Sequence, residues 1–540
     1  MDKNIVKGDE IELDIESNLG QLTYLLLQTY EENVIQIDAI TGEELTGGII
    51  LKRAIRVANH FKKYGIGLGD SVSVMSENRL EFVAVPVAAF LVGASFAPLN
   101  PEYTPDELRH VLNLSKPKII FSSAQTIQKL IEIRKDHPYI KQLLLFGSNE
   151  INSSFIGFDT IIKGCENDEM QFEVEPYCSK ETVATVLCSS GTTGMPKGVM
   201  CTHYNMISFI EIARAIFSRM LDDFTEGHSN VVGIIPFFHS FGFMTMYLNI
   251  LRGSTMVVFS KFKPKIFMDA IVKHKISRLL VPPPILLFLI KHPLAQKYDL
   301  SFLKEILAGA APLSKETEME LKKKFKVRHV GQGYGMTETT FGVMTNPFDK
   351  SKSGSVGILV PGMMAKIIDE QGNALGPNQE GELCLKGPLI MKGYINDEAA
   401  TNNCIDKDEW LHTGDVAYYD DEKYFFIVDR IKELIKYKAY QVAPAELEAL
   451  LLTHPAVADV AVIGLPDENA GELPFAFVVT KEGATVSEEE LKELVASKLS
   501  SQKKLRGGVR FVKEILRNPS GKILRRVLKQ QAIAYTKSKL

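Results

Sequence analysis

The stretch Ser189-Ser190-Gly191-Thr192-Thr193-Gly194-Met195-Pro196-Lys197-Gly198 is dense in glycine and hydroxyl side chains. It follows a β-branched, strand-like run and precedes a helical pattern. Glycines let backbone N–H groups turn inward toward an anion, hydroxyl groups add donors, and Lys197 adds a positive charge. The spacing differs from that of the P-loop, G-x-x-x-x-G-K-[ST]. The stretch therefore predicts a polyphosphate-binding loop between a strand and a helix.

Outside this loop, strand-like apolar runs alternate with amphipathic helical patterns as far as Asp429. The strand-like runs are Ser71–Met75, Lys118–Phe121, Gln142–Phe146, Thr182–Cys188, Asn230–Ile235, Thr255–Phe259 and Arg278–Val281. Between two of them, Thr104, Pro105 and Glu107 have the spacing of a capping box at the start of a helix. This alternation predicts an α/β fold with a largely parallel sheet.

The pattern changes twice toward the carboxyl end. From Gly354 to Tyr394, short β-prone pieces separated by Gly, Pro and Asn predict a small β-barrel-like subdomain. Beyond Lys432 a compact α+β unit is expected, built from a helix at Pro444–Leu452, strands at Ala458–Leu465 and Phe475–Thr480, and a helix capped by Ser487. We expect a large N-terminal domain (1–431) and a smaller C-terminal α+β domain (432–540).

The composition is that of a globular protein. The hydrophobic fraction is 45% and the charged fraction is 24%, which argues against disorder over most of the length. Positive charge is concentrated in residues 501–540, where twelve Lys and Arg accompany a single acid, Glu514. No aromatic-interleaved basic motif accompanies them, so we expect no nucleic acid partner. The six cysteines lack metal-ligand spacing and predict reduced thiols.

Two stretches bear on membranes and location. Phe82–Leu99 is eighteen residues long and uncharged, but it contains Pro86 and Gly93, so a buried helix followed by a buried strand is expected rather than a transmembrane segment. Ser538-Lys539-Leu540 has the form of the S-K-L peroxisomal address. We therefore expect a peroxisomal import receptor as partner and the peroxisome as location.

The Ser189–Gly198 loop resembles the phosphate-binding signature of the adenylate-forming superfamily, which includes acyl-CoA synthetases, plant coumarate-CoA ligases and beetle luciferases. The resemblance covers essentially the whole chain, and the further motifs occur in the family's order. It implies ATP and Mg²⁺ as cofactors, a carboxylic acid activated as an acyl-adenylate, and transfer of the acyl group to coenzyme A. In the loop, it implies phosphate-binding roles for Ser189, Ser190, Gly191, Thr192, Thr193, Gly194 and Lys197.

The second motif is Gly331-Gln332-Gly333-Tyr334-Gly335-Met336-Thr337-Glu338-Thr339. A glycine-rich stretch with an aromatic ring and an acid suits base stacking and cation binding. The resemblance implies that Tyr334 packs on adenine, Thr337 contacts the α-phosphate and Glu338 holds Mg²⁺. It also assigns Gln332, Gly333, Gly335 and Met336 to the nucleotide site, together with Gly309, Ala310 and Ala311 of the adenine-side turn.

A third motif, His412-Thr413-Gly414-Asp415, places an aspartate after a glycine turn. Such an aspartate can accept hydrogen bonds from both ribose hydroxyls, although an isolated instance is as often an Asx-turn residue. The resemblance gives Asp415 the ribose role. It also implies that Arg430 reaches the ribose and the phosphates.

Two lysines of the C-terminal domain complete the predicted chemistry. In Asn518-Pro519-Ser520-Gly521-Lys522, Lys522 resembles the mobile lysine that bridges the substrate carboxylate and ATP, stabilising charge on the pentavalent α-phosphate. Lys436 begins the segment that the family uses for the second step. Ala439 of that segment stands where the family usually carries Gly, so its methyl group would narrow the thiol tunnel or be harmless. We expect rotation about a hinge near Lys432 to exchange the two lysines.

The acyl site is expected around Pro236-Phe237-Phe238-His239-Ser240-Phe241-Gly242. A lone histidine among aromatic residues is usually a core residue, but the resemblance places His239 beside the substrate carboxylate. An apolar slot suited to an aliphatic chain is predicted from Phe209, Phe241, Phe243, Thr245 and Met246.

The end of the chain is luciferase-like, from Ile435 to Glu446 and again at Leu505–Val509. Phe209, however, stands where beetle luciferases carry Arg, and Ser240 where firefly enzymes carry Gly. We therefore expect a non-luminous insect paralogue that acts as a medium- or long-chain fatty acyl-CoA synthetase. The alternatives are a luciferase that oxidises luciferyl-adenylate with O₂, a 4-coumarate-CoA ligase-like enzyme, and a non-catalytic nucleotide- or acyl-binding relative.

Overall fold

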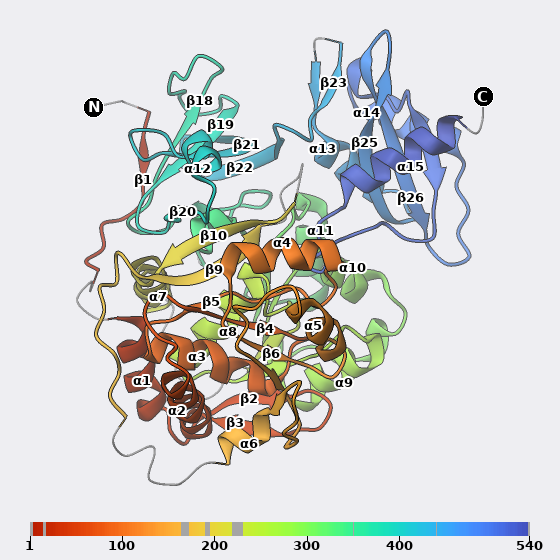
Figure 1. Cartoon of the computed structure of the whole chain (residues 1–540). Coiled ribbons are helices and arrows are strands. Elements are labelled where there is room, and N and C mark those ends of the chain that lie inside the picture. The colour runs from red at the N-terminus through yellow and green to blue at the C-terminus, as the bar shows by residue number, and fades with distance from the viewer. Residues whose placement is uncertain are drawn as a thin grey trace.

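The computed structural model describes residues 4–13, 18–163, 172–189, 195–218, 230–348, 350–438 and 440–537. A large N-terminal domain carries three sheets, and a small C-terminal domain, blue in Figure 1, stands to one side of them. The expected architecture, a large α/β domain with a β-rich subdomain and a smaller α+β domain, is confirmed. The expected boundary at 431/432 falls in the turn between β22 and β23.

The first sheet contains the strands that lead into the predicted phosphate loop. In spatial order its eight strands are β20 (Gly393–Tyr394), β10 (Lys197–Thr202), β9 (Val183–Ser189), β5 (Ser95–Phe96), β4 (Ser71–Met75), β6 (Ile119–Ser122), β7 (Gln142–Leu145) and β8 (Ile156–Gly157). From β9 to β8 the pairs are parallel, whereas β9–β10 and β10–β20 are antiparallel. The first half of the chain also forms α1 (Leu19–Thr29), α2 (Gly47–Lys63), η1 (Leu80–Val83), α3 (Ala84–Leu91), α4 (Pro105–Ser115), α5 (Ile127–Arg134) and α6 (Phe158–Ile162).

Two expectations for this region are confirmed. The predicted capping box is present, since Thr104 and Glu107 exchange side-chain-to-backbone hydrogen bonds at the start of α4. The apolar run Phe82–Leu99 forms the buried α3 and then the short β5. Within the described ranges, no helix is long and apolar enough to cross a membrane.

The second sheet positions most of the candidate site. Its nine strands, in spatial order, are β17 (Ile358–Leu359), β16 (Gly342–Thr345), β15 (His329–Gly335), β14 (Glu305–Ala308), β13 (Ile276–Val281), β11 (Asn230–Gly233), β12 (Met256–Val258), β2 (Val34–Asp38) and β3 (Glu44–Thr46). The strands from β15 to β2 are parallel. The helical elements of this part are α7 (His203–Ser218), α8 (Ser240–Leu251), α9 (Pro264–Lys273), α10 (Pro283–Lys291), η4 (Ala295–Lys297), α11 (Lys315–Phe325) and η5 (Thr337–Thr339). Ligands of α/β folds bind at the carboxyl ends of such strands, which is where the glycine-rich stretches of β14 and β15 end.

One hydrophobic core joins the two sheets. Phe82 packs edge-on against Phe237, with ring centroids 5.5 Å apart, and Phe96 stacks on Phe243 at 5.4 Å. All four rings are almost completely buried. Because the helices between the sheets share this core, the two sheets form a rigid base for the site.

The β-rich subdomain is a third, antiparallel sheet. Its five strands are β1 (Val6–Lys7), β18 (Met364–Ile368), β19 (Gly381–Lys386), β21 (Leu411–Tyr419) and β22 (Phe425–Arg430), and α12 (Glu398–Cys404) lies between β20 and β21 in the chain. Along β21, buried and half-buried residues alternate, as expected for a strand with one face in the core. This alternation turns Asp415 inward.

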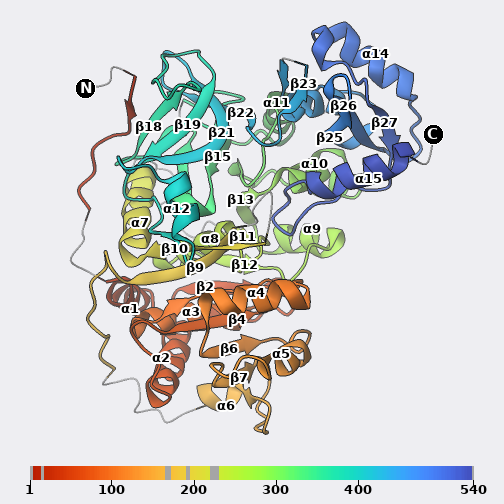
Figure 2. The ribbon, with the colours of Figure 1, turned by 45° about the horizontal axis from the view of Figure 1, so that its top comes forward.

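The C-terminal domain is a compact α+β unit. It contains β23 (Ile435–Tyr437), β24 (Tyr440–Val442), α13 (Pro444–Leu452), β25 (Val457–Asp467), β26 (Gly471–Thr480), α14 (Glu488–Lys498), η6 (Ser501–Lys503), β27 (Gly508–Phe511) and α15 (Arg525–Lys537). Helix α13 has the predicted bounds, and Ser487 caps α14 by accepting from the Glu490 N–H at 3.1 Å. Figure 2 shows this domain lying against α10, where the Lys291 ammonium donates to the Val457 carbonyl at 3.4 Å.

The predicted strand-to-helix setting of the phosphate loop is wrong. The chain returns from β9 as the antiparallel strand β10, with Ser189 paired to Lys197, and α7 begins only at His203. Gly198 allows the close approach of Ile395, which directly follows β20, because a Cβ atom at Gly198 would meet Ile395 at 2.6 Å. Strands β9 and β10 therefore form an antiparallel pair, and a strand rather than a helix follows the predicted loop.

Candidate active site

A cavity of about 190 Å³ opens at the carboxyl edge of β13, β14 and β15 and runs between α7 and α8. The large domain supplies most of its wall, and Lys522 of the small domain reaches into it. The lining residues include Phe209, Ile212, Ala213, Ile216, His239, Ser240, Phe241, Thr245, Leu248, Gly309, Ala310, Gly333, Tyr334, Gly335, Met336, Thr337, Phe341 and Lys522. The polar lining residues include His239, Thr337 and Lys522, whereas α7 and α8 contribute mainly apolar side chains.

Hydrogen bonds between the Asn518 side chain and neighbouring backbone N–H groups hold the Lys522 loop in place. The Asn518 side-chain oxygen accepts from the N–H groups of Ser520 and Lys522, at 3.1 and 2.9 Å. Gly521 adopts a φ of +88° and lies so close to Pro282 that a Cβ atom would approach it to 3.0 Å. Only glycine combines this conformation with this contact at little cost. The turn thereby delivers Lys522 to the cavity.

Lys522 lies within electrostatic reach of the residues predicted to bind the nucleotide. Burial lowers the pKa of Lys522, and the positive charge of Arg430 lowers it further, whereas Glu338 and Asp415 oppose the shift. Residues far apart in the sequence therefore converge on one site. The small domain supplies only the lysine of this group.

The Asp415 carboxylate stands between a phenol and a guanidinium. Tyr334 Oη donates to Asp415 Oδ2 at 2.5 Å, and Arg430 Nε lies 3.3 Å from Asp415 Oδ1. Asp415 and Arg430 face each other across the β21–β22 ladder, which explains their pairing. Burial raises the pKa of Asp415, and Arg430 opposes that rise. Both carboxylate oxygens are thus held in fixed positions, as a ribose-binding acid requires.

The turn before Asp415 is braced by a residue that the sequence analysis did not single out. Glu382 accepts from the Gly414 N–H at 3.1 Å with one oxygen and lies 3.1 Å from His412 Nδ1 with the other. Gly414 itself has a φ of +70°. Glu382 comes from the neighbouring strand β19, so only strand pairing brings it to the motif.

Glu338 and Lys197 meet at a shared tyrosine. Tyr394 Oη donates to Glu338 Oε1 at 2.8 Å, and the Lys197 ammonium lies 4.7 Å from the centre of the Tyr394 ring. The Glu338 residue is 6% exposed. Mg²⁺ is commonly held by one or two carboxylates together with substrate phosphates, so the Glu338 carboxylate fits that ion. Tyr394 was not predicted from the sequence, because this residue belongs to no motif and reaches the site through the β10–β20 pairing.

His239 caps helix α8 and lines the cavity. Its Nδ1 atom accepts from the Phe241 N–H at 3.3 Å. Burial, with a smaller contribution from the Lys522 charge, lowers the pKa of His239 to about 3. The imidazole is therefore neutral at physiological pH. Next to it, the Ser240 hydroxyl lies 3.3 Å from the Thr337 hydroxyl.

The acyl side of the cavity is walled by aromatic rings. Phe341 lies 4.8 Å from Phe209 and 5.9 Å from Phe241, measured between ring centroids. The Thr245 hydroxyl donates to the Phe241 carbonyl at 2.7 Å, which leaves its methyl group for the cavity. Phe341 was not predicted from the sequence, since it follows the nucleotide motif with no distinguishing pattern.

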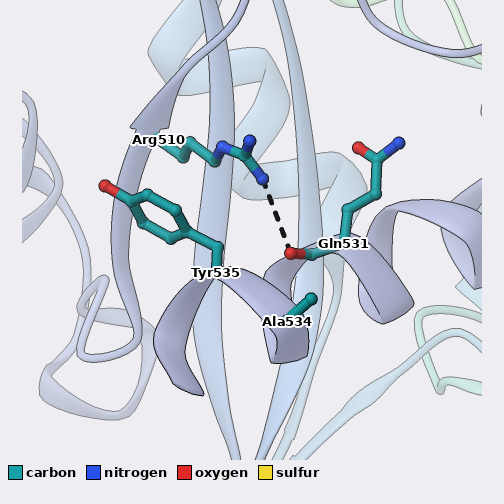
Figure 3. Close-up of a pocket in the computed structure, with 4 residues that line it drawn as sticks. All are labelled: Arg510, Gln531, Ala534 and Tyr535. Carbon is teal, nitrogen blue, oxygen red and sulfur yellow. Dashed lines mark hydrogen bonds between the residues drawn. The ribbon is translucent and has the colours of Figure 1, made fainter. Parts of the chain in front are cut away.

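A second hollow, of about 450 Å³, lies on the small domain between β27 and α15 (Figure 3). The Arg510 guanidinium lies 4.6 Å from the centre of the Tyr535 ring and donates to the Gln531 carbonyl at 3.5 Å. The guanidinium group of Arg510 is thus already engaged. None of the residues that line this hollow belongs to the predicted nucleotide or acid site.

Comparison with known proteins agrees with this geometry. Residues 28–395 match the sequence model of the AMP-binding enzymes, and residues 446–522 match that of the AMP-binding enzyme C-terminal domain. The chain belongs to the AMP-binding enzyme family. It is thus an adenylate-forming enzyme with an ATP site, and the residues described above lie where its two matched regions meet.

Relatives of this AMP-binding enzyme span its whole length. It is 40% identical over 538 residues to a luciferin 4-monooxygenase of Photuris pensylvanica, covering 98% of each chain. It is 38% identical to the peroxisomal OPC-8:0-CoA ligase 1 of Arabidopsis thaliana, covering 99% of this chain and 96% of the relative. The crystal structure of ATP-bound MatB from Rhodopseudomonas palustris superposes with a TM-score of 0.85 at 26% identity, covering 96% of this chain and all of that one. Both a luciferin 4-monooxygenase and a CoA ligase are therefore represented by name among its relatives.

Two predicted pocket residues of this AMP-binding enzyme, Phe243 and Met246, do not line the cavity. Phe243 is fully buried and stacks on Phe96 and Tyr247, away from the cavity wall. The helical period explains the error, because residues spaced by three or four, such as Phe241 and Thr245, share the cavity face of α8 while Phe243 faces the core. Met246 is also fully buried on the core side.

Gln332 and Ala311, which were predicted to bind the nucleotide, are not among the residues that line the cavity. Gln332 uses both ends of its side chain on the Leu313 backbone, at 3.1 Å each, and so supports the Gly309–Pro312 turn. In that turn Ala310 lines the cavity with a φ of +68°, whereas Ala311 is not among the lining residues. Ser189 lies at the end of β9, and the loop residues Ser190–Gly194 lie outside the described part of the chain.

Lys436 is not brought to the cavity. It is exposed on β23, where its backbone N–H donates to Glu472 at 3.0 Å, and the nearby Tyr440 side chain is 55% exposed. Lys522 occupies the site instead. Ala439 and the S-K-L residues lie outside the described ranges, so the predictions that rest on them remain predictions.

Proposed function

We propose that this enzyme is an acid–thiol ligase that activates a medium- or long-chain fatty acid as its acyl-adenylate and transfers the acyl group to coenzyme A. The observation that carries the proposal is the composition of the cavity. One end holds Lys522, neutral His239 and Thr337, and the wall beyond them is built from Phe209, Phe341 and the aliphatic residues of α7 and α8. A charged head and an apolar tail are thus accommodated together.

In the first step, a carboxylate oxygen attacks the α-phosphate of ATP and pyrophosphate leaves. Lys522 would orient the carboxylate and stabilise the negative charge that develops on the phosphate. Lys197 would hold the phosphates, and Asp415 would fix the ribose through its two oriented oxygens. Mg²⁺ held by Glu338 would supply charge neutralisation between phosphate groups when bound. Catalysis of this kind requires positioning and charge stabilisation rather than covalent help from the protein.

The second step needs a different face of the small domain. With Lys522 in the cavity and Lys436 exposed, the observed arrangement suits adenylation. The turn at 431–434 joins the two domains, and Lys432 is exposed there. Rotation about this turn would withdraw Lys522 and bring the Lys436 segment to the adenylate, where the thiol of coenzyme A attacks the acyl carbon and AMP leaves.

A luciferase is the second candidate, because luciferin 4-monooxygenases are among the relatives. Phe209 argues against it. Its ring lies in the cavity wall against Phe341, where the resemblance to beetle luciferases calls for an arginine. An apolar ring at this position favours an aliphatic tail over a polar heteroaromatic acid. We also propose a peroxisomal location, in line with the name of the Arabidopsis relative.

The test is a panel of fatty, cinnamic and luciferin acids. ATP–pyrophosphate exchange measures adenylation, mass spectrometry measures the coenzyme A thioester, and a luminometer measures light. We expect the largest exchange and thioester yield with fatty acids and no light above background. Preferred use of cinnamic acids, or light emission that depends on luciferin and ATP, would reject the fatty acid assignment.

A further inference from the structure

The cavity does not end in an apolar wall. Beyond the rings of the acyl side it reaches two buried polar residues, Glu305 and His329, at the start of strands β14 and β15. The register explains how they come together. Arg278, Glu305 and His329 lie side by side across β13, β14 and β15, and two residues further along, Leu280, Leu307 and Gly331 form the next row. Alternate residues share one face of a sheet, so both rows face the cavity side.

Gly331 opens the path to the histidine. A Cβ atom at Gly331 would lie 2.8 Å from His329 Nε2 and 3.2 Å from the Asn346 side chain. Any side chain here would therefore separate His329 from the cavity. Leu280 and Leu307 line the cavity beside this gap, so an apolar passage leads to a polar end.

His329 has hydrogen-bonding capacity to spare. Its residue is 2% exposed and its ring stacks on Phe348. The Phe348 backbone interacts with the imidazole, but among the described residues no group lies at the length and angle of a full hydrogen bond to either ring nitrogen. Burial lowers the pKa of His329, with the nearby Glu305 charge and the Phe348 backbone opposing the shift. A neutral imidazole offers one donor and one acceptor. An unsatisfied polar group at the end of a cavity is costly unless a ligand completes it.

The other polar side chains at this end already interact with charged side chains or with the backbone. Arg278 Nε lies 2.6 Å from Glu305 Oε2, and both side chains are buried. Arg252 adds a second positive charge within electrostatic reach of Glu305. The Asn346 side chain bonds to the backbone of Gln332 and Ser355. Glu305 lies directly beside His329 in the sheet register, so a carboxylate placed against His329 would meet a like charge, whereas a neutral hydroxyl group would not.

Resting on the proposed function, we propose that the natural acid carries a neutral hydrogen-bonding group, a hydroxyl, at the end of its apolar chain, and that His329 and Glu305 bind it. The hydroxyl donates to the Glu305 carboxylate and accepts from the His329 N–H. Gly309, at the nucleotide end, and Glu305 are four residues apart on one strand and its continuation, which places the two ends of the passage about 13 Å apart. A medium-length chain spans this distance.

The test compares acids of equal length that differ only at the far end: methyl, hydroxyl and carboxyl. For each chain length, ATP–pyrophosphate exchange gives kcat/KM. We expect the hydroxylated acid to be preferred over the methyl-ended acid by about tenfold at the best length, and the dicarboxylic acid to be the poorest. Equal use of the methyl and hydroxyl acids at every length would overturn the inference while leaving fatty acid activation intact. Exchange with none of them would instead reject the proposed function.

Two variants locate the effect. His329→Leu should bring the hydroxyl-to-methyl ratio close to one, and His329→Gln, which keeps a donor and an acceptor, should retain part of the preference. His292→Leu, on the exposed end of α10, is the matched histidine control and should keep the full ratio. Thermal unfolding and ATP binding report whether each variant is folded. If His329→Leu does not fold, Gly331→Ala decides, since its methyl group should block the passage and shorten the best chain length. An unchanged ratio in folded His329→Leu, or an unchanged length in Gly331→Ala, would overturn the inference.

Discussion

Replacing Lys522 by methionine should separate the two half-reactions of this enzyme. The ammonium group lines the cavity, where few water molecules screen it, and it faces the site in which charge develops on the α-phosphate. Removing one preorganised group of this kind costs about 2.7–4 kcal/mol of transition-state stabilisation, a factor of about 10²–10³ in rate. Methionine keeps the apolar stem, and the turn from Asn518 to Gly521 is unchanged, so the small domain should still dock.

The assay measures each step alone. ATP–pyrophosphate exchange in the presence of the acid reports adenylation, which should fall by about 10²–10³. Single-turnover reaction of synthetic acyl-AMP with coenzyme A reports the second step, which should stay within about threefold of the parent enzyme because the exposed Lys436 segment serves it. The margin is less than 1 kcal/mol, the size expected when no direct contact is lost.

Lys436→Met is the mirror-image control, since it should spare exchange and slow the reaction of preformed acyl-AMP. Together the two variants test the expected exchange of faces about the turn near Lys432. If Lys522→Met slowed both half-reactions equally, or left exchange unchanged, the assignment of Lys522 to adenylation and the hinge model would both be wrong.

Three further predictions follow from the cavity, the nucleotide contacts and the buried histidines. Ala213→Phe should fill the apolar wall and shift the preferred acid to a shorter chain, with kcat/KM for the longest good substrate falling at least tenfold; an unchanged length profile in the acid panel would show that α7 does not line the acyl path. Asp415→Asn should weaken ATP binding by about 10–100-fold, because hydrogen bonds to a charged group contribute about 1.5–3 kcal/mol and the Arg430 charge loses its partner. Isothermal titration calorimetry measures the ATP affinity, and an affinity like that of the parent enzyme would contradict the ribose role of Asp415. Burial lowers the pKa of His203 from 6.5 to about 3. Between these two pH values the unfolded chain binds the proton more readily than the folded chain, so the free energy of unfolding falls as the pH drops from 6.5 toward 3. In denaturant titrations across that window, His203→Phe should reduce the slope of unfolding free energy by about 1.4 kcal/mol per pH unit, and an unaltered slope would mean that His203 is protonated in the folded state.

Local pattern was sufficient for much of this molecule. Strands β4, β6 and β7 and helix α13 lie at or within a residue or two of their predicted positions, and helix α4 begins where its capping box predicted. Alternation, capping residues and proline at helix starts act over a few neighbouring residues. The glycine-rich motifs and Lys522 were equally visible, since their chemistry is written in consecutive residues. The resemblance then ordered them into one reaction.

Tertiary structure decided what consecutive residues cannot specify. The antiparallel pair β9–β10 replaced the expected strand-to-helix setting, and β10 also pairs with β20, which lies far along the chain. Tyr394 and Glu382 reached the site only through neighbouring strands, and Phe243 turned to the core because the rotation of α8 is set by packing. The row of Arg278, Glu305 and His329 exists only in the register of three parallel strands. Local propensity acts over a few residues, whereas sheet register and domain docking join residues hundreds of positions apart, and these alone determine which side chains face one cavity.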